Sequence, residues 1–175
     1  MSIVNTLLKV FLGDKSGKDL KKLTPLVDEI NKHFIGMSSL SNDELRDKTY
    51  NFKKIISNKT TELVSSLKKL NESITNESSN IEKEKLFSEV EIVEKELSET
   101  KAQILDEILP EAFAVVKETA RRFYENESVK VSASEFDKEI GSKKSYVTID
   151  GESAIWKNSW DAAGKNVLWD MIHYD

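Results

Sequence analysis

The side chains best suited to chemistry gather near the end of the 175-residue chain, where Asp161 is followed by Asp170, His173 and Asp175. Carboxylates and an imidazole could bind a metal ion, but such a site needs several ligands held rigidly by supporting partners. The spacing of these four residues does not meet that requirement, so we predict no metal site. The other histidine, His33, lies beside an apolar stripe and is predicted to be a surface residue.

A phosphate-binding loop is the second chemistry to consider, in the stretch GDKSGKDL at residues 13–20. Its two glycines are too close together for the spacing Gly-x-x-x-x-Gly, and Lys18 is followed by Asp19 rather than serine or threonine. An aspartate there would repel a phosphate and leave magnesium without its hydroxyl ligand. We find no nucleophile elbow and no paired-carboxylate motif either, so the sequence predicts no complete active site in this chain.

The composition is typical of a helical protein with long solvated faces, since 33% of the residues are charged and 38% are hydrophobic. A net charge of -5 argues against nonspecific binding to nucleic acid, and the absence of cysteine excludes disulfides and zinc–thiolate sites. No apolar run is long enough to span a bilayer, and the first residues lack the features of a secretory signal.

The first element that the pattern predicts is a short amphipathic helix that ends at Gly13. Its apolar face consists of Ile3, Leu7, Leu8 and Phe11. Two covers for this face stay open: packing on the protein itself, which we favour, and contact with a membrane surface or a membrane partner.

A second helix follows, and we expect it to bury one apolar stripe. The stripe consists of Leu20, Leu23, Val27, Ile30 and Phe34. Pro25 interrupts it, so Thr24-Pro25 is either the N-cap and first turn of a helix or the site of a kink.

The clearest local signal is LSNDEL, in which Ser41 and Glu44 form a capping box and Leu40 and Leu45 a hydrophobic staple. A helix therefore begins at Asn42. Two long stripes follow, separated by the polar turn formers NESITNESSN at residues 71–80. They consist of Leu45, Phe52, Ile56, Leu63, Leu67 and Leu70, and of Leu86, Val90, Val93, Leu97, Ile104 and Ile108. This pattern predicts an antiparallel helical hairpin.

The segment ILPEAFAVVKETARRF, residues 108–123, is predicted to be helical and structural. Pro110 marks a new first turn or a kink after Leu109. The two arginines, Arg121 and Arg122, suit the negative end of a helix dipole and need no ligand. The predicted buried stripe consists of Phe113, Val116, Ala120 and Phe123.

The pattern changes after Glu125 to that of β structure. VKVSA alternates as a strand does, and SEFDKEIG could form one helical turn closed by Gly141. YVTIDGESAIW predicts a hairpin in which Asp150 and Gly151 form a type I′ turn. The three tryptophans, Trp156, Trp160 and Trp169, are expected to pack the hairpin against its neighbour, with a Trp-lined binding surface as the alternative.

Four blocks of the sequence, taken in order, resemble the SecA family, the motor ATPases of bacterial protein export. The specific block is LPEAFAVVKETARR, residues 109–122. LLKVFLGDKSGKDLKKLTPLVDEIN resembles the family's opening helices and LSNDELRDKT its next helix start. MIHYD, residues 171–175, resembles the beginning of the adenine-recognition motif, which in the family reads Met-Arg-His-Phe-Asp.

The resemblance implies a mainly α fold in three parts. Residues 1–125 would form an N-terminal helical region with a long hairpin insertion at about 57–107. Residues 126–169 would form a Trp-rich β insertion with a small hairpin, and residues 170–175 would begin the first nucleotide-binding fold. In the family the phosphate-binding loop lies beyond this point.

The same resemblance places Met171, His173 and Tyr174 at the edge of the adenine pocket. Ile172 replaces the family's arginine and Tyr174 its phenylalanine, so a contact from the position of Ile172 is in doubt.

The implied function is that of a motor that couples ATP hydrolysis, with Mg2+, to translocation of preproteins through the SecYEG channel. Its implied partners are the channel, preprotein, anionic lipids and a second copy in a homodimer, without nucleic acid. It would be cytoplasmic and peripherally associated with the inner face of the cytoplasmic membrane. The 175-residue chain alone would be inactive. The alternative is a non-enzymatic helical interaction protein that acts as a scaffold through its hairpin.

Overall fold

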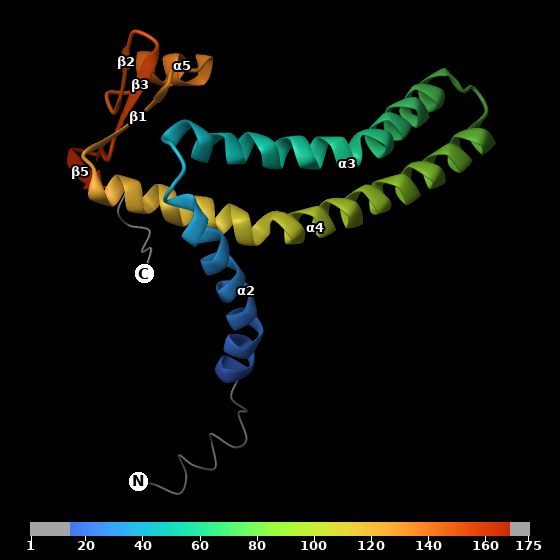
Figure 1. The fold of residues 1–175 in the computed structure, drawn as a ribbon. Helices are drawn as coiled ribbons and strands as arrows, with labels where there is room; N and C mark the ends of the chain where they lie inside the picture. Colours follow the sequence, from blue (N-terminus) through green and yellow to red (C-terminus); the bar gives the residue numbers. More distant parts are fainter. Residues whose placement is uncertain (1–14, 169–175) are drawn as a thin grey trace, which may run out of the picture.

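A computed structural model describes residues 15–168 of the chain, and side chains from residue 21 onward except that of Lys22. It is mainly α, with a small β part near the end of the described region, as predicted (Figure 1). The helices are α2 (Lys15–Met37), α3 (Asn42–Asn76), α4 (Asn80–Glu125) and α5 (Glu135–Lys143). The strands are β1 (Ser128–Ser132), β2 (Val147–Asp150), β3 (Ser153–Lys157), β4 (Ser159–Ala162) and β5 (Lys165–Leu168). The predicted first helix, with Ile3, Leu7, Leu8 and Phe11, lies outside the described residues, and so does Trp169.

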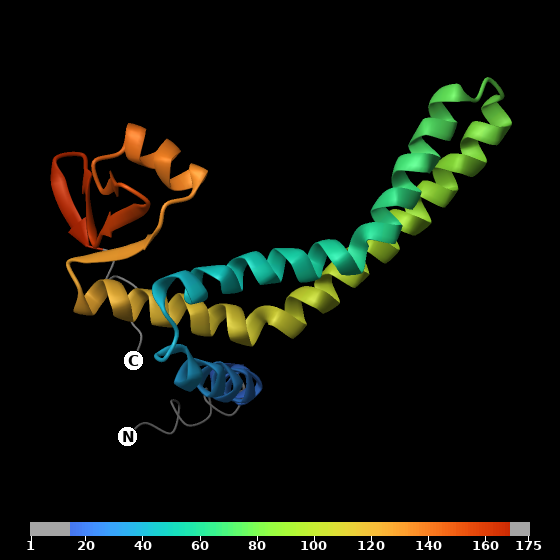
Figure 2. The same ribbon diagram turned by 45° about the horizontal axis from the view of Figure 1, so that its top comes forward.

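The predicted hairpin is confirmed: α3 and α4 run antiparallel and curve away from the rest of the molecule (Figure 2). The capping box forms with Ser41 as N-cap of α3, because its hydroxyl accepts from the backbone N–H of Glu44 while the Glu44 carboxylate accepts from that of Ser41. The turn lies within the predicted polar stretch 71–80, but it is shorter than that stretch. Helix α3 continues to Asn76, residues 77–79 alone form the turn, and Ser79 caps α4.

Pro110 does not begin a new helix, because α4 runs through it for 46 residues. The predicted stripe of this segment is half wrong. Ala120 is buried, but Phe113 is 54% exposed and Val116 is 46% exposed. The other buried residues of this segment are Pro110, Ala114, Val115 and Glu118, which lie one or two positions from the predicted ones because the buried side of α4 continues from Ile104.

Helix α2 also contains its proline, so Thr24-Pro25 is not an N-cap. The stripe is partly buried at Ile30 and Phe34, whereas Leu23 and Val27 are about half exposed, because α2 crosses α4 and projects away from it (Figure 1). The core lies at this crossing. It consists of Met37, Leu45, Phe52, Ala114 and Val115, with Ile30, Phe34, Leu40, Ile108 and Ala112 packed around them.

The β part contains a three-stranded antiparallel sheet in the order β1-β3-β2 and a separate hairpin of β4 and β5. The β2–β3 hairpin is confirmed, but Asp150 pairs with Ser153, so Gly151 and Glu152 form its turn. Gly151 has a φ of 57° and Glu152 has no positive φ, which together fit the Gly-first type II′ turn rather than type I′, in which both central residues have a positive φ. The β4–β5 hairpin was not predicted.

The prediction of a single turn closed by Gly141 is also wrong, because α5 spans nine residues and includes this glycine. Ser134 and Asp137 form a second capping box at its start. The expected packing role of Trp156 is confirmed, because its ring lies 6.4 Å from that of Phe136 and 6.2 Å from that of Tyr146.

Candidate functional site at the base of the hairpin

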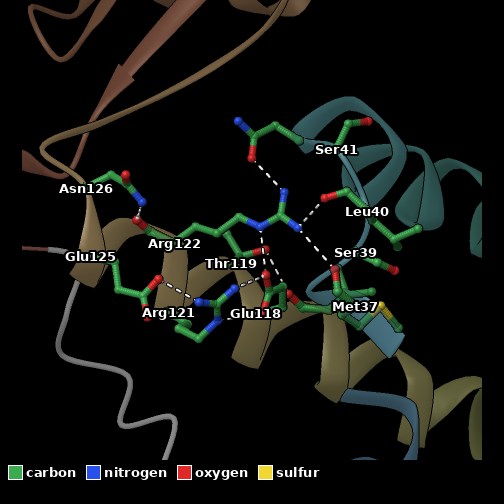
Figure 3. A network of polar contacts seen from close by, with 12 residues as sticks. Met37, Ser39, Leu40, Ser41, Glu118, Thr119, Arg121, Arg122, Glu125 and Asn126 are labelled. Carbon is green, nitrogen blue, oxygen red and sulfur yellow. Dashed lines mark hydrogen bonds and ion pairs between the residues drawn. The ribbon is translucent and has the colours of Figure 1, made fainter. Parts of the chain in front are cut away.

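A buried carboxylate is the centre of a polar network where the hairpin meets α2 (Figure 3). The Glu118 side chain is fully buried and accepts hydrogen bonds from Arg121 Nη2 at 2.7 Å and Arg122 Nε at 2.8 Å. Burial would raise the pKa of Glu118, but the hydrogen bonds from the two arginines outweigh it, so that the pKa lies below its usual value. Arg121 also pairs with Glu125 at 2.6 Å.

Arg122 connects this carboxylate to two other elements. Its Nη2 donates to the backbone carbonyls of Met37 at 3.1 Å and Leu40 at 2.7 Å, where α2 ends. Its Nη1 donates to Asn42 Oδ1 at 2.6 Å, in the first turn of α3. The prediction that the two arginines only complement their own helix dipole is therefore wrong, because Arg122 caps another helix.

The first turn of α3 extends the network to the sheet. Asn42 Nδ2 donates to the carbonyl of Lys130 at 2.9 Å. The Asp43 carboxylate accepts from the Ser132 backbone N–H at 2.8 Å, and Arg46 Nη1 donates to the Ser132 carbonyl at 3.0 Å. Three side chains of one helix thus occupy the outer edge of β1, where another strand would otherwise bind.

A second buried carboxylate, Asp137, lies on the other side of this contact. It accepts hydrogen bonds from Arg46 Nη2 at 2.5 Å, Trp156 Nε1 at 2.9 Å and the Ser134 hydroxyl at 2.6 Å. Burial alone would raise the pKa of Asp137, but these bonds and that of the Ser134 backbone N–H lower it to about 2. The carboxylate therefore joins α3, α5 and β3 at neutral pH.

Between the two networks lies a hollow of about 250 Å³. Its apolar lining comes from α3, α4, β1 and β3, and consists of Leu45, Val115, Phe123, Val129, Val131 and Trp156. Asn42, Arg46, Thr49, Thr119 and Arg122 complete the lining. Since both helices of the hairpin and two strands contribute to its lining, the hollow lies where the hairpin and the β part meet.

The residues that the sequence singled out for chemistry are not brought together here. Met171, His173 and Tyr174 lie outside the described residues. Of the four residues first considered as metal ligands, Asp170, His173 and Asp175 also lie outside them. The fourth of these residues, Asp161, accepts a hydrogen bond from the Gly164 backbone N–H at 2.9 Å and stabilises the β4–β5 turn. Within residues 15–168 no group of three or more His, Asp or Glu side chains could hold a metal ion. His33 is exposed, as predicted.

The carboxylates and arginines of the two networks were missed as a site. One signal was present: Glu118 stands three and four positions before Arg121 and Arg122, so all three side chains share one region of a helix. For Asp137 no signal pointed to Arg46, since they are far apart in the sequence and meet only when the sheet packs on α3.

Comparison with known proteins adds the family. A model of the SecA DEAD-like domain matches residues 8–135. The chain is 45% identical over 175 residues to the protein translocase subunit SecA of Flavobacterium psychrophilum. The matched region covers 100% of this chain and 16% of that relative. The corresponding protein of Christiangramia forsetii is 46% identical over the same share of each chain. That of Bacteroides fragilis is 39% identical over 171 residues, 98% of this chain and 15% of the relative.

These relatives are much longer, since the chain spans about a sixth of their length. No solved structure matches the chain. Among residues 15–168, no helix is both long enough and apolar enough to cross a membrane.

Proposed function

The chain belongs to the SecA family of protein translocase subunits, and we propose that it forms the amino-terminal part of a motor that couples ATP hydrolysis to preprotein translocation through the SecYEG channel. The observation that supports this proposal most directly is identity of 45% or more with two SecA proteins over the whole chain. The proposal includes a cytoplasmic motor that binds peripherally to the inner face of the cytoplasmic membrane.

The described part of the chain does not fit ATP and Mg2+. The glycines of the stretch at residues 13–20 have the wrong spacing for a phosphate-binding loop, most of this stretch lies in helix α2, and residues 15–168 offer no cluster of metal ligands. We therefore derive no step through the nucleotide and expect no ATP hydrolysis by the chain alone. Release of phosphate by the purified chain, free of any full-length motor, would contradict this expectation.

An exposed apolar face of α4 supports a role as part of a larger fold. Leu105, Phe113 and Val116 are each about half exposed and lie on the side of α4 that neither α3 nor α2 covers. We infer that this face packs on the nucleotide-binding fold of the motor.

Met171, His173 and Tyr174 are proposed to form the edge of the adenine pocket in that fold, by resemblance. In a full-length motor, Tyr174→Ala should weaken the binding of a fluorescent ATP analogue because a stacking surface is lost. An unchanged dissociation constant would remove Tyr174 from the pocket.

The amphipathic segment at the start of the chain, with Leu7 and Phe11 on its apolar face, is proposed to contact anionic lipid or the channel. Deletion of residues 1–12 should reduce co-sedimentation with anionic liposomes. Equal binding by the shortened and complete chains would count against the membrane contact.

The identity of the motor can be tested by reading the coding DNA beyond the codon for Asp175. A glutamine codon soon afterwards, and then a Gly-x-x-x-x-Gly-Lys-Thr loop, is expected. A stop codon would instead favour the helical interaction protein, whose working surface would be the hairpin. Homodimerisation of the motor can be measured by sedimentation of the full-length protein that this DNA encodes.

A further inference from the structure

The outer half of the hairpin, residues 60–100, is a long surface with open sides. Its two helices contact each other along one seam, and in both views no other element of the described chain lies beside them there (Figure 1, Figure 2). A pair of helices buries only one stripe of each, so the rest of both surfaces is available to a partner. The side chains on these surfaces determine which partner fits.

The two helices of the hairpin carry opposite net charge. Between residues 50 and 76, α3 has five lysines and two glutamates. Between residues 80 and 107, α4 has four lysines and nine acidic residues. Within these two ranges one ion pair joins the helices, Lys59 with Glu107 at 2.6 Å. Most of the opposite charge of the two helices therefore faces solvent.

One side of the hairpin combines these charges with apolar surface. Val64 on α3 and Phe87 on α4 each follow a leucine of the seam by one position, and in an antiparallel helix pair such positions lie on the same side. Val64 is 50% exposed and Phe87 is 53% exposed. Lys68 lies one turn beyond Val64, and Glu91 and Glu94 lie one and two turns beyond Phe87. We call the surface of these five residues the Phe87 side.

The charges of the Phe87 side are poorly neutralised within one copy. Glu91 and Glu94 have no ion pair in the part of the chain that the structure describes, and at a spacing of three positions they repel each other. Lys68 lies 4.0 Å from Glu72, and its side chain is 79% exposed. A cation brought to α4 and an anion brought to α3 would each be stabilised there.

The heights of these groups match for a two-fold pair of hairpins. Lys68 lies eight residues before the end of α3, and Glu91 lies eleven residues after the start of α4. Both are therefore roughly 12 to 17 Å from the tip of the hairpin. A two-fold axis along the hairpin on its Phe87 side brings α3 of one copy onto α4 of the other at equal heights. Each Lys68 then meets Glu91 and Glu94 of the other copy.

The surface is also large enough for a stable pair. The arm of α4 from residue 80 to residue 107 is roughly 40 Å long, and two helices side by side are about 20 Å wide. This gives an area of roughly 800 Å², which is the area that each partner buries in a stable complex. The exposed Val64 and Phe87 would be covered within it.

We propose that the hairpin binds the hairpin of a second copy of this chain, as a two-fold four-helix bundle in which Lys68 of each copy pairs with Glu91 and Glu94 of the other. A partner with a single sign of charge would match one helix and repel the other, whereas a second copy matches both. The inference does not rest on the proposed motor function, because it uses only residues of the hairpin.

Sedimentation equilibrium of the complete 175-residue chain tests the pairing. A dimer is expected at low salt, and added salt should weaken it because the ion pairs are close to solvent. Lys68→Glu should weaken the dimer roughly tenfold, since both symmetric contacts change from attraction to repulsion. Lys69→Glu is the matched control, because it makes the same change at the next residue, on another side of α3, and should leave the affinity unchanged.

The deciding experiment mixes two variants. The double variant Glu91→Lys, Glu94→Lys should also dimerise weakly by itself, because its added lysines face Lys68 of the other copy. In an equimolar mixture with Lys68→Glu, all of these contacts again join opposite charges. The mixture should therefore form a heterodimer with about the affinity of the unmodified chain. Circular dichroism of each variant shows whether its helices are intact.

Three results would overturn the proposal. The first is a monomer at low salt up to the highest soluble concentration of the chain. The second is equal weakening by Lys68→Glu and Lys69→Glu, which would place any association on another surface. The third is a mixture of the two folded variants that associates no better than either variant alone.

Discussion

The ionised Asp137 carboxylate is stabilised by Arg46 of the hairpin and by Ser134 and Trp156 of the β part, and its contribution to folding can be measured. Its pKa of about 2, against an ordinary value of 3.8, means that the folded protein stabilises the ionised form. One pKa unit corresponds to about 1.4 kcal/mol, so this interaction contributes about 2 kcal/mol to the free energy of unfolding at neutral pH. Because the folded-state pKa is the lower one, this contribution is complete above about pH 5 and is lost as the pH falls through about 2.

Asp137→Asn removes the charge and keeps the shape. We expect the variant to unfold with a free energy about 2 kcal/mol lower than the unmodified chain at pH 7, and most of this difference to be lost by pH 2. Urea titrations at pH 7, 4, 3 and 2 would follow tryptophan fluorescence, which reports on the β part because all 3 tryptophans lie beyond residue 155. Asp150→Asn, at an exposed carboxylate, is the matched control and should change stability little.

Two outcomes would refute this reasoning. If Asp137→Asn has the stability of the unmodified chain at pH 7, the ionised carboxylate and its three side-chain partners contribute nothing net. If the difference between the two proteins is the same at pH 7 and pH 2, the effect comes from packing and not from ionisation.

The remaining predictions concern the other network and two glycines. Arg122→Met leaves Glu118 buried with Arg121 alone and should lower the free energy of unfolding by about 3 kcal/mol, measured by circular dichroism; an unchanged midpoint in urea would show that the network is not stabilising. Gly164→Ala should cost about 1 kcal/mol in the same assay because Gly164 has a φ of 79°, and a stabilised variant would contradict the turn geometry. Gly36→Ala, at a helical position where an added methyl group meets nothing within 4 Å, should raise stability by about 0.5 kcal/mol; a loss would contradict the open space there.

Local patterns predicted much of the helical fold. The capping box at Ser41 and the two stripes of the hairpin could be predicted because each depends on residues a few positions apart. At each proline the sequence left two alternatives open, a first turn or a kink, and the structure excludes the first turn for a physical reason. A helix loses one hydrogen bond at Pro110, but the packing of Ile104 and Val115 on α3 continues on both sides of it and outweighs that loss.

The site depends on contacts between distant segments, which no local pattern contains. Asn42 meets Lys130 and Arg46 meets Asp137 only after the sheet has packed on the hairpin. The β4–β5 hairpin was missed because Ala163 adopts a φ of 54°, a conformation for which alanine gives no signal. The proposed adenine-pocket residues stay a prediction.

The occupied edge of β1 has a consequence for how the β part could be separated from the rest. An unpaired strand edge is a template for pairing with other chains and hence for fibrils. Here the backbone groups of Lys130 and Ser132 are bonded to the first turn of α3. Residues 126–168 expressed without the hairpin would uncover these groups in solution. The stretch Asn42–Arg46 therefore has two roles. Its residues begin helix α3, and they also block the edge of β1 against pairing with a strand of another chain.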